Sequence, residues 1–295
     1  MIVFIYAVLV FLVLRFSVTV FNFLSNPKLN KYGRRFTDTV SIIISPSTNE
    51  DISGLMKSIE RQDYQNLEVI VRANNEDEQI AVDKAKGKYL LFLDVNVEIG
   101  SGLINNLIHR ARVFDLTLLN LIPTHKLTSL YDWCVFPLKE FIILNIFPLR
   151  LVRFTGSPAF ASANTGCTFF NADHYRENRS RERVETLLAN GLLVNAKPQA
   201  NIAARQLLPI FGNNVLVALV YLSLIIAGPV VMFLYFEPAF VALPIGLIFL
   251  SRVMISFLTN QNPIYNVLLH PIQMLVLSWS LLKEISKKLL RSSPN

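Results

Sequence analysis

The sequence contains few of the residues that build disulfide frameworks and metal sites. It has only two cysteines, Cys134 and Cys167, in 295 residues. Two cysteines make no framework, and the simplest interpretation is a reduced, cytosolic soluble portion. The four histidines show no metal-ligand spacing. There is also no internal repeat and no low-complexity linker, so the chain is not a repeat array.

Charged residues are scarce as well, at 17% of the chain, whereas hydrophobic residues make up 52%. The mean hydropathy is +0.42 and the isoelectric point about 9.4. An ordinary soluble protein of this size is less apolar, so membrane segments are expected. The formal net charge of +7 comes largely from basic residues beside hydrophobic stretches. Such residues suit anionic lipid headgroups, and we expect membrane lipids rather than nucleic acid as partners.

Residues 1–27 are predicted to form an N-terminal transmembrane anchor, with Arg15 as the only charge between residues 2 and 24. A cleaved signal peptide is disfavoured because no basic residue precedes the apolar run and no small-residue cleavage site follows it. An arginine inside a span normally indicates a functional residue, but for Arg15 we favour the alternative that it snorkels toward the inner headgroups. The residues that follow include four basic ones, Lys28, Lys31, Arg34 and Arg35. This excess of positive charge predicts that the next domain lies in the cytoplasm. The chain is then expected to be a multi-pass protein of the inner membrane.

Residues 207–295 are predicted to form a C-terminal transmembrane region of about three hydrophobic helices. Its apolar segments are residues 215–236, 238–257 and 264–282. With the N-terminal anchor, these segments make four spans. A chain that begins outside and crosses the membrane four times ends outside, yet its C-terminal tail is basic, which is typical of the cytoplasmic side. The last segment is therefore either interfacial or re-entrant, or the tail is translocated. A transporter or channel is disfavoured because few ionisable residues lie at membrane depth, namely Arg15, Arg252 and His270.

Residues 28–206 read as one cytoplasmic α/β domain. Residues 39–45, 67–71 and 89–93 are expected strands, and helical segments alternate with them, which predicts a parallel, doubly wound sheet. Residues 188–192 are expected to form a turn. The aromatic and arginine-flanked segment 128–153 is predicted to be a helix in the membrane interface. Its alternative is a helix buried in the core of the α/β domain.

The short apolar stretch at residues 89–93 follows Gly87 and ends on Asp94. A continuous apolar run of this length is typical of a central parallel strand. Open α/β sheets bind ligands at the carboxyl ends of such strands, and an acid there can hold a metal ion that neutralises a phosphate. The alternative is that Asp94 only opens a turn, where aspartate is common.

Several short motifs follow one another along the chain. They are Ser45-Pro46, Asn49-Glu50, Gln62-Asp63-Tyr64, residues 67–71, residues 85–89, Leu91-Phe92-Leu93-Asp94, residues 147–153, residues 158–164, Asn262-Pro263-Ile264-Tyr265 and Leu269-His270-Pro271. Their order, together with the N-terminal anchor, resembles membrane-bound family-2 glycosyltransferases of the GT-A fold. The most similar branch is the bacterial one that glycosylates carotenoid-type and other polyprenoid or lipid acceptors. The resemblance implies an α/β domain with a GT-A-like, Rossmann-like mixed sheet.

The resemblance also implies a site for a nucleotide sugar. Pro46, Asn49 and Glu50 then lie on the nucleotide side, and a D-x-D motif at Asp94 and Asn96 holds Mn²⁺ or Mg²⁺. The metal stabilises the negative charge that develops on the diphosphate leaving group. A carboxylate must also take the proton of the acceptor hydroxyl.

The candidates for this catalytic base are Glu182 and Glu185. Their alternative role is that of acids in the first turn of a helix, where the helix dipole stabilises them.

Three functional positions depart from the family pattern. The acid that binds the nucleoside falls on Ala73 or Asn74, and Asn96 replaces the second acid of D-x-D. By spacing, the catalytic pair falls near Arg179 and Ser180. The hard cations depend on charged oxygen ligands, so metal binding is expected to be weaker.

Two hypotheses follow from these departures. In the first, the chain is a catalytically impaired pseudoenzyme that needs no cofactor and acts as a structural or partner subunit of a membrane complex. In the second, it is an active glycosyltransferase that moves a sugar from a nucleotide donor to a membrane-lipid acceptor, with Mn²⁺ or Mg²⁺. The joint loss at three positions favours the first.

Overall fold

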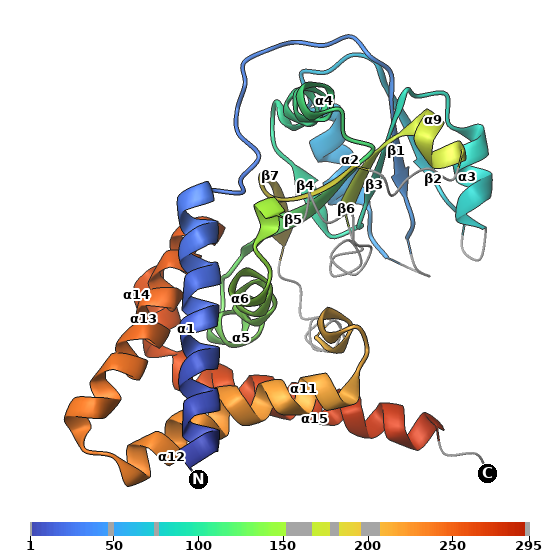
Figure 1. Ribbon diagram of the computed structural model, residues 1–295. Coiled ribbons are helices and arrows are strands. Elements are labelled where there is room, and N and C mark those ends of the chain that lie inside the picture. Colours follow the sequence, from blue (N-terminus) through green and yellow to red (C-terminus); the bar gives the residue numbers. More distant parts are fainter. Residues whose placement is uncertain are drawn as a thin grey trace. The chain divides into compact units, whose positions relative to one another are not determined.

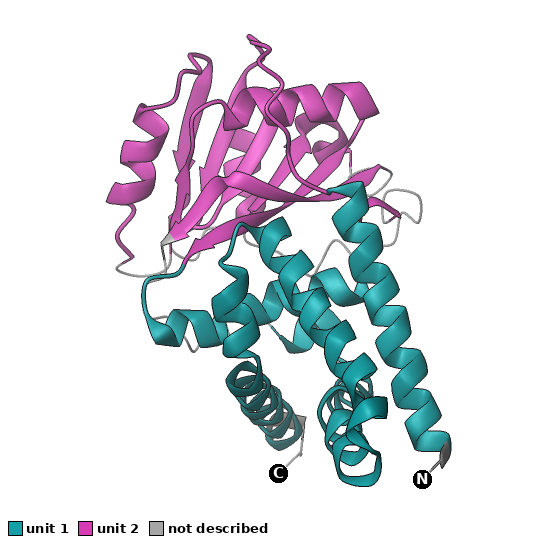
Figure 2. Ribbon diagram, turned by 90° about the vertical axis from the view of Figure 1, so that its left-hand side faces the viewer, with its two compact units in different colours: residues 1–26, 127–148, 198–295 teal, residues 27–126, 149–197 magenta. Residues whose placement is uncertain are grey.

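The computed structural model describes the chain in six stretches: residues 2–46, 50–73, 77–151, 167–177, 183–195 and 207–292. The chain divides into two compact units (Figures 1 and 2). Unit 1 comprises residues 1–26, 127–148 and 198–295. Unit 2 comprises residues 27–126 and 149–197.

Unit 2 contains a seven-stranded sheet and four helices among its described residues. The strands are β1 (Val40–Ile44), β2 (Leu67–Val71), β3 (Tyr89–Leu93), β4 (Val97–Ile99), β5 (Leu118–Lys126), β6 (Cys167–Asn171) and β7 (Val184–Asn195). The helices are α2 (Ser53–Glu60), α3 (Glu78–Lys84), α4 (Leu103–Phe114) and α9 (Ala172–Arg176).

The strands are ordered β2-β1-β3-β6-β5-β7-β4 across the sheet. β1 pairs in parallel with β2 and β3, as the sequence predicts. β6 is antiparallel to both β3 and β5, and β4 is antiparallel to β7. The expectation of a wholly parallel sheet is therefore corrected, and the predicted class, an α/β domain with a mixed sheet, is confirmed.

The central strands are hydrophobic on both faces because helices cover both. Every residue of β1 and β3 is buried. Successive side chains of a strand point to opposite faces. Accordingly, Ile42 and Leu91 belong to the larger hydrophobic cluster, whereas Ile43 and Leu90 belong to a smaller one. Residues of α2 and α4 join the larger cluster, and residues of α3 and α9 join the smaller one.

A hydrogen-bond network around Ser41 fixes the start of β3 against β1 and β2. Ser41 is fully buried, and its hydroxyl donates to Glu68 of β2 and accepts from the Gly87 amide at 2.8 Å. The amide of Lys86 also donates to Glu68, at 2.9 Å. Burial opposes ionisation of Glu68, but these hydrogen bonds outweigh it and lower the pKa of that carboxyl.

The expected turn at residues 188–192 is replaced by an irregularity within β7. Ala189 pairs with Pro123 of β5 and Leu193 pairs with Thr124, so residues 190–192 have no partner on β5. The amide of Gly100 donates to the Gly191 carbonyl at 2.6 Å. A side chain at position 191 would begin 3.1 Å from the Leu103 side chain. Gly191 therefore permits close packing here and does not form a turn.

The regular secondary structure among the described residues of unit 1 is all helical. The helices are α1 (Ile2–Ser25), α5 (Leu130–Val135), α6 (Pro137–Ile146), η1 (Leu208–Phe211), α11 (Val215–Leu222), η2 (Ser223–Ala227), α12 (Gly228–Tyr235), α13 (Pro238–Thr259), α14 (Pro263–Leu268) and α15 (His270–Ser292). η2 is a short π-helical segment that joins α11 to α12.

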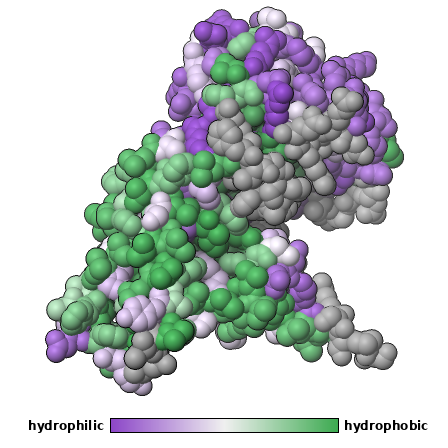
Figure 3. Space-filling model, viewed as in Figure 1, coloured by the Kyte–Doolittle hydropathy of each residue, from purple (hydrophilic) through white to green (hydrophobic). Residues whose placement is uncertain are grey.

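Three helical stretches among the described residues are long and apolar enough to cross a membrane: residues 3–25, 215–235 and 238–259. They agree with three of the four hydrophobic segments predicted from the sequence. Hydrophobic side chains cover most of the visible face of unit 1 (Figure 3). The fourth segment breaks into α14 and α15, and α15 is amphipathic, with several exposed lysines.

The segment 128–153, predicted as an interfacial helix with a helix in the core of the α/β domain as the alternative, instead contributes α5 and α6 to the helical unit 1. α6 is buried along nearly its whole length, and it packs against α1 and α13 within unit 1. Thr19 of α1 donates to Asn145 at 2.9 Å, and Asn22 donates to the carbonyl of Leu144 at 2.9 Å. Among the described residues of this segment, the large hydrophobic side chains exposed as an interfacial helix requires are those of Leu130, Tyr131 and Leu151.

We expect Gly87→Ala to destabilise the protein, because its new methyl group would lie 2.5 Å from the Ser41 amide nitrogen and 2.8 Å from the Tyr89 carbonyl oxygen. These are backbone atoms, so the strands must separate. The control is Gly54→Ala in α2, where nothing lies within 4 Å and alanine favours the helix. Thermal unfolding in detergent should show a lower midpoint for the first variant only, and equal midpoints would contradict the network.

Candidate functional site

The carboxyl ends of three parallel strands form one edge of the unit 2 sheet. Ile44, Val71 and Leu93 are the last residues of β1, β2 and β3, and they are register partners. The residues that follow each strand therefore emerge side by side. This is the edge at which open α/β sheets bind ligands.

Asp94 leaves β3 at this edge with an exposed side chain. Its Oδ1 accepts a hydrogen bond from the Asn96 amide at 3.1 Å and faces the Asn96 side-chain nitrogen at 3.3 Å. Its carbonyl accepts from the Val97 amide, which leads directly into β4. Asp94 thus stabilises a turn after β3, which is the alternative to a metal-binding role that the sequence left open. Its Oδ2 makes no hydrogen bond to any described residue.

The predicted nucleotide-side residues lie only partly within the described chain. Pro46 follows β1 and is half-buried, and Glu50 is half-buried as well. Asn49 and Asn74 fall outside the described residues, and so does the motif at residues 158–164. Asp77, the nearest acid after β2, caps α3 by accepting from the Gln79 amide at 3.2 Å. The role of these residues in nucleotide binding stays a prediction.

Glu185 does not occupy the position of a catalytic base. It lies on β7 rather than in the first turn of a helix, and its side chain is 1% exposed. Arg110 of α4 donates to both of its carboxylate oxygens, at 2.6 and 2.7 Å, and Arg150 donates to Oε1 at 2.9 Å. A carboxylate enclosed by two guanidinium groups cannot reach an acceptor hydroxyl. Glu182, the other candidate, is outside the described residues.

The three side chains form a buried ionic cluster that holds α4 to the sheet. Burial opposes the charged form of Arg110, but hydrogen bonds and attraction to Glu185 outweigh it and raise the pKa of Arg110. The ring of Phe114 lies 3.9 Å from the guanidinium carbon of Arg110. Sequence reasoning missed Arg110, because its partner is 75 residues away.

The described residues bring no three histidine, cysteine, aspartate or glutamate side chains together as a metal-binding group. Asp94 and Asn96 provide one carboxylate and one amide. Because Mg²⁺ is held by one or two carboxylates plus substrate phosphates and water, these two residues supply only the minimum for a metal that arrives with a diphosphate.

Comparison with known proteins gives similarities of structure only. No family model matches the chain, and no curated protein matches its sequence. A mannosyltransferase of Pyrobaculum calidifontis, PcManGT, solved with GDP-Man and Mn²⁺, covers 94% of this chain and 99% of its own, with 10% identity and a TM-score of 0.49. S. aureus TarS, solved with UDP, covers 85% of this chain and 91% of its own, with 12% identity and a TM-score of 0.37. At these values the similarities do not extend to substrates or to individual residues.

In unit 1, the expectation that Arg15 snorkels is wrong. Its side chain lies inside the helical unit, surrounded by the rings of Phe11, Phe141 and Tyr221. Arg252 of α13 is buried beside the same Phe141 ring. The sequence signal for this cluster was the presence of arginine within two apolar segments.

We expect Arg110→Met to lower the free energy of unfolding by about 3 kcal/mol, because it removes one partner of a buried ion pair. The control is Arg112→Met on the same helix. Arg112 pairs with Asp38, but its side chain is 45% exposed, so its loss should change stability by about 0–1 kcal/mol. Thermal unfolding of both variants in detergent measures the difference. Equal losses would show that burial of the Arg110 pair is not what stabilises α4.

Proposed function

We propose that this chain is a glycosyltransferase-like membrane protein that has lost sugar transfer and serves as a structural or partner subunit of a membrane complex. The observation that carries the proposal is the position of Glu185. One of the two carboxylates expected to act as the base is enclosed by Arg110 and Arg150 and holds α4 against the sheet.

The metal end of the site supports the same conclusion. Asn96 provides no charge, and one oxygen of Asp94 is already used by the turn that leads to β4. A divalent ion bound here would have a single protein carboxylate. Since the hard cations depend on charged oxygen ligands, donor binding should be weak.

One observation favours the alternative of an active transferase. Asp94 is exposed at the carboxyl edge of β3, where a nucleotide sugar with Mn²⁺ or Mg²⁺ would reach it. Glu182 would then act as the base toward a lipid acceptor of polyprenoid or carotenoid type. This alternative is tested by the same experiment.

The three apolar stretches support a placement in the inner membrane. If the N-terminus of α1 lies outside, α1 crosses to the cytoplasm and unit 2 lies there. The stretch of residues 215–235 then crosses back to the outside, and α13 crosses to the cytoplasm again. α15 then lies on the cytoplasmic side, in the interface, with Lys283, Lys287 and Lys288 beside anionic headgroups. Three spans therefore remove the conflict between an even number of spans and a basic tail.

We expect the purified protein to release no nucleoside diphosphate from UDP- or GDP-sugars, with or without Mn²⁺, and to show no metal-dependent binding in calorimetric titration. Asp94→Ala should be indistinguishable from the wild type in both assays. Metal-dependent release that Asp94→Ala abolishes would establish the transferase instead.

A gain-of-charge variant serves as the positive control for this test. Asn96→Asp restores the second acid of the D-x-D motif and should strengthen the binding of Mn²⁺ with UDP or GDP. If Asn96→Asp binds and the wild type does not, the site has the required geometry and lacks only the charge.

Cysteine labelling should establish the direction of the spans. Glu237→Cys, between α12 and α13, should react with a membrane-impermeant maleimide in right-side-out vesicles. Lys287→Cys on α15 should react only after the vesicles are opened. Both positions are exposed, whereas the natural Cys134 and Cys167 are buried and should stay unlabelled. Labelling of Lys287→Cys in sealed vesicles would place the tail outside.

A further inference from the structure

Two arginines lie within the apolar helices of unit 1, and both are almost completely buried. Arg15 of α1 is 6% exposed and Arg252 of α13 is 1% exposed. Both guanidinium groups lie beside the ring of Phe141 on α6, with their carbon atoms 5.1 Å and 3.4 Å from its centroid. Two positive charges are thus gathered within one small part of the unit.

Neither charge has an anionic partner among the described residues. The guanidinium of Arg15 donates no hydrogen bond there, and its Nε is buried without an acceptor. Arg252 donates from Nε to Nδ1 of His270 at 2.8 Å, and one of its terminal nitrogens is also buried without an acceptor.

The surrounding rings do not compensate for this burial. Arginine stays protonated in proteins, so it cannot relieve the penalty by losing its charge. Desolvation of a buried ion is unfavourable by several kcal/mol, whereas a cation–π contact returns about 0.5–2 kcal/mol. The two like charges, both beside Phe141, also repel each other. The cluster therefore requires a negative charge that the described residues do not supply.

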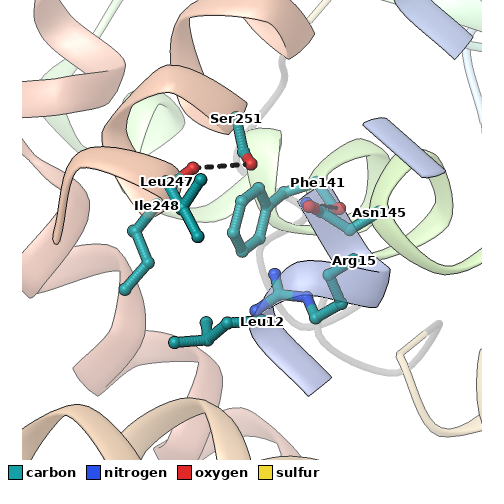
Figure 4. A pocket seen from close by; sticks show the side chains of 7 residues that line it. All are labelled: Leu12, Arg15, Phe141, Asn145, Leu247, Ile248 and Ser251. Atoms are coloured by element: carbon teal, nitrogen blue, oxygen red, sulfur yellow. Dashed lines mark hydrogen bonds between the residues drawn. The ribbon is translucent and has the colours of Figure 1, made fainter. Parts of the chain in front are cut away.

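A pocket gives an anion access to Arg15. It is lined by Leu12, Arg15, Phe141, Asn145, Leu247, Ile248 and Ser251. Its empty space is about 220 Å³, which includes the open mouth. Arg15 is the one charged residue in this lining, and its guanidinium points into the space beside Phe141 (Figure 4).

The other polar groups of the lining are already engaged. The Asn145 amide donates to the Phe141 carbonyl and accepts from Thr19, and the Ser251 hydroxyl donates to the Leu247 carbonyl. The remaining lining is apolar. Outside the pocket, the neighbouring residues of α1 and α13 expose Val13, Leu14, Leu243 and Leu250. An anion attached to an apolar chain suits these surroundings, whereas a free, hydrated anion does not.

We propose that this pocket between α1, α6 and α13 binds the phosphate group of an anionic membrane lipid. Arg15 donates to the phosphate at the mouth of the pocket, and Arg252 adds its charge from beside Phe141. The acyl chains lie along the apolar outer faces of α1 and α13. The site is contained in unit 1 and does not depend on whether unit 2 transfers sugars.

The test compares three additives to the full chain in neutral detergent: phosphatidylglycerol, diacylglycerol with the same acyl chains, and inorganic phosphate. Phosphatidylglycerol should raise the midpoint of thermal unfolding and remain bound in native mass spectrometry. Diacylglycerol should do neither, because it lacks the phosphate. Equal stabilisation by inorganic phosphate would overturn the lipid as the source of the anion.

Arg15→Met should weaken the binding of phosphatidylglycerol by roughly 10- to 100-fold, as expected for loss of a hydrogen bond between charged groups. Without lipid, its unfolding midpoint should be no lower than that of the wild type, because an uncompensated charge has been removed. Lys287→Met removes one exposed charge from α15 and should leave binding unchanged.

Arg15→Lys keeps the positive charge and replaces Arg15→Met as the test variant if Arg15→Met does not fold. It should bind phosphatidylglycerol more weakly than the wild type, because lysine lacks the planar fork of donors that matches a phosphate. Equal affinity in the wild type and in either variant would overturn the proposal. The two arginines would then be packing elements held by their aromatic neighbours.

Discussion

The requirement that a buried charge meet an opposite charge shapes both units of this chain. In unit 2, Glu185 is enclosed by Arg110 and Arg150, so the carboxylate is neutralised and α4 is fixed to β7. In unit 1, Arg15 and Arg252 are buried without a carboxylate among the described residues. The same rule therefore assigns a structural role to the first group and calls for a bound anion at the second.

Local sequence patterns were sufficient for the strands and helices whose burial is uniform. The run Tyr89–Leu93 was predicted as a strand because continuous apolar residues suit a position covered on both faces. The course of β7 was not predictable, because Asn190 and Gly191 are typical turn residues, whereas in the structure they lie within a strand that pairs with β4 and shifts register against β5. Likewise, no local pattern could place the antiparallel β6 between β3 and β5.

The site was predictable in its location and less so in its residues. The position of Asp94 after β3 follows from the strand pattern and from the rule for open sheets. Glu185 was misread because its environment depends on Arg110, which is distant in sequence, and on a strand where a helix was expected. Arg15 was misread for a similar reason. Hydropathy indicates that it lies in an apolar segment, but only the packing of α6 shows that it faces inward.

The contacts that hold the sheet together are separate from those that would carry the reaction. Ser41, Glu68 and Gly87 join β1, β2 and β3 at their amino ends, whereas Asp94 and Asn96 lie beyond the carboxyl end of β3, in an exposed turn. Substitution of exposed residues at that edge therefore has little effect on stability. A sheet built in this way can lose the acids of a transferase and keep its fold, because different residues support the two properties.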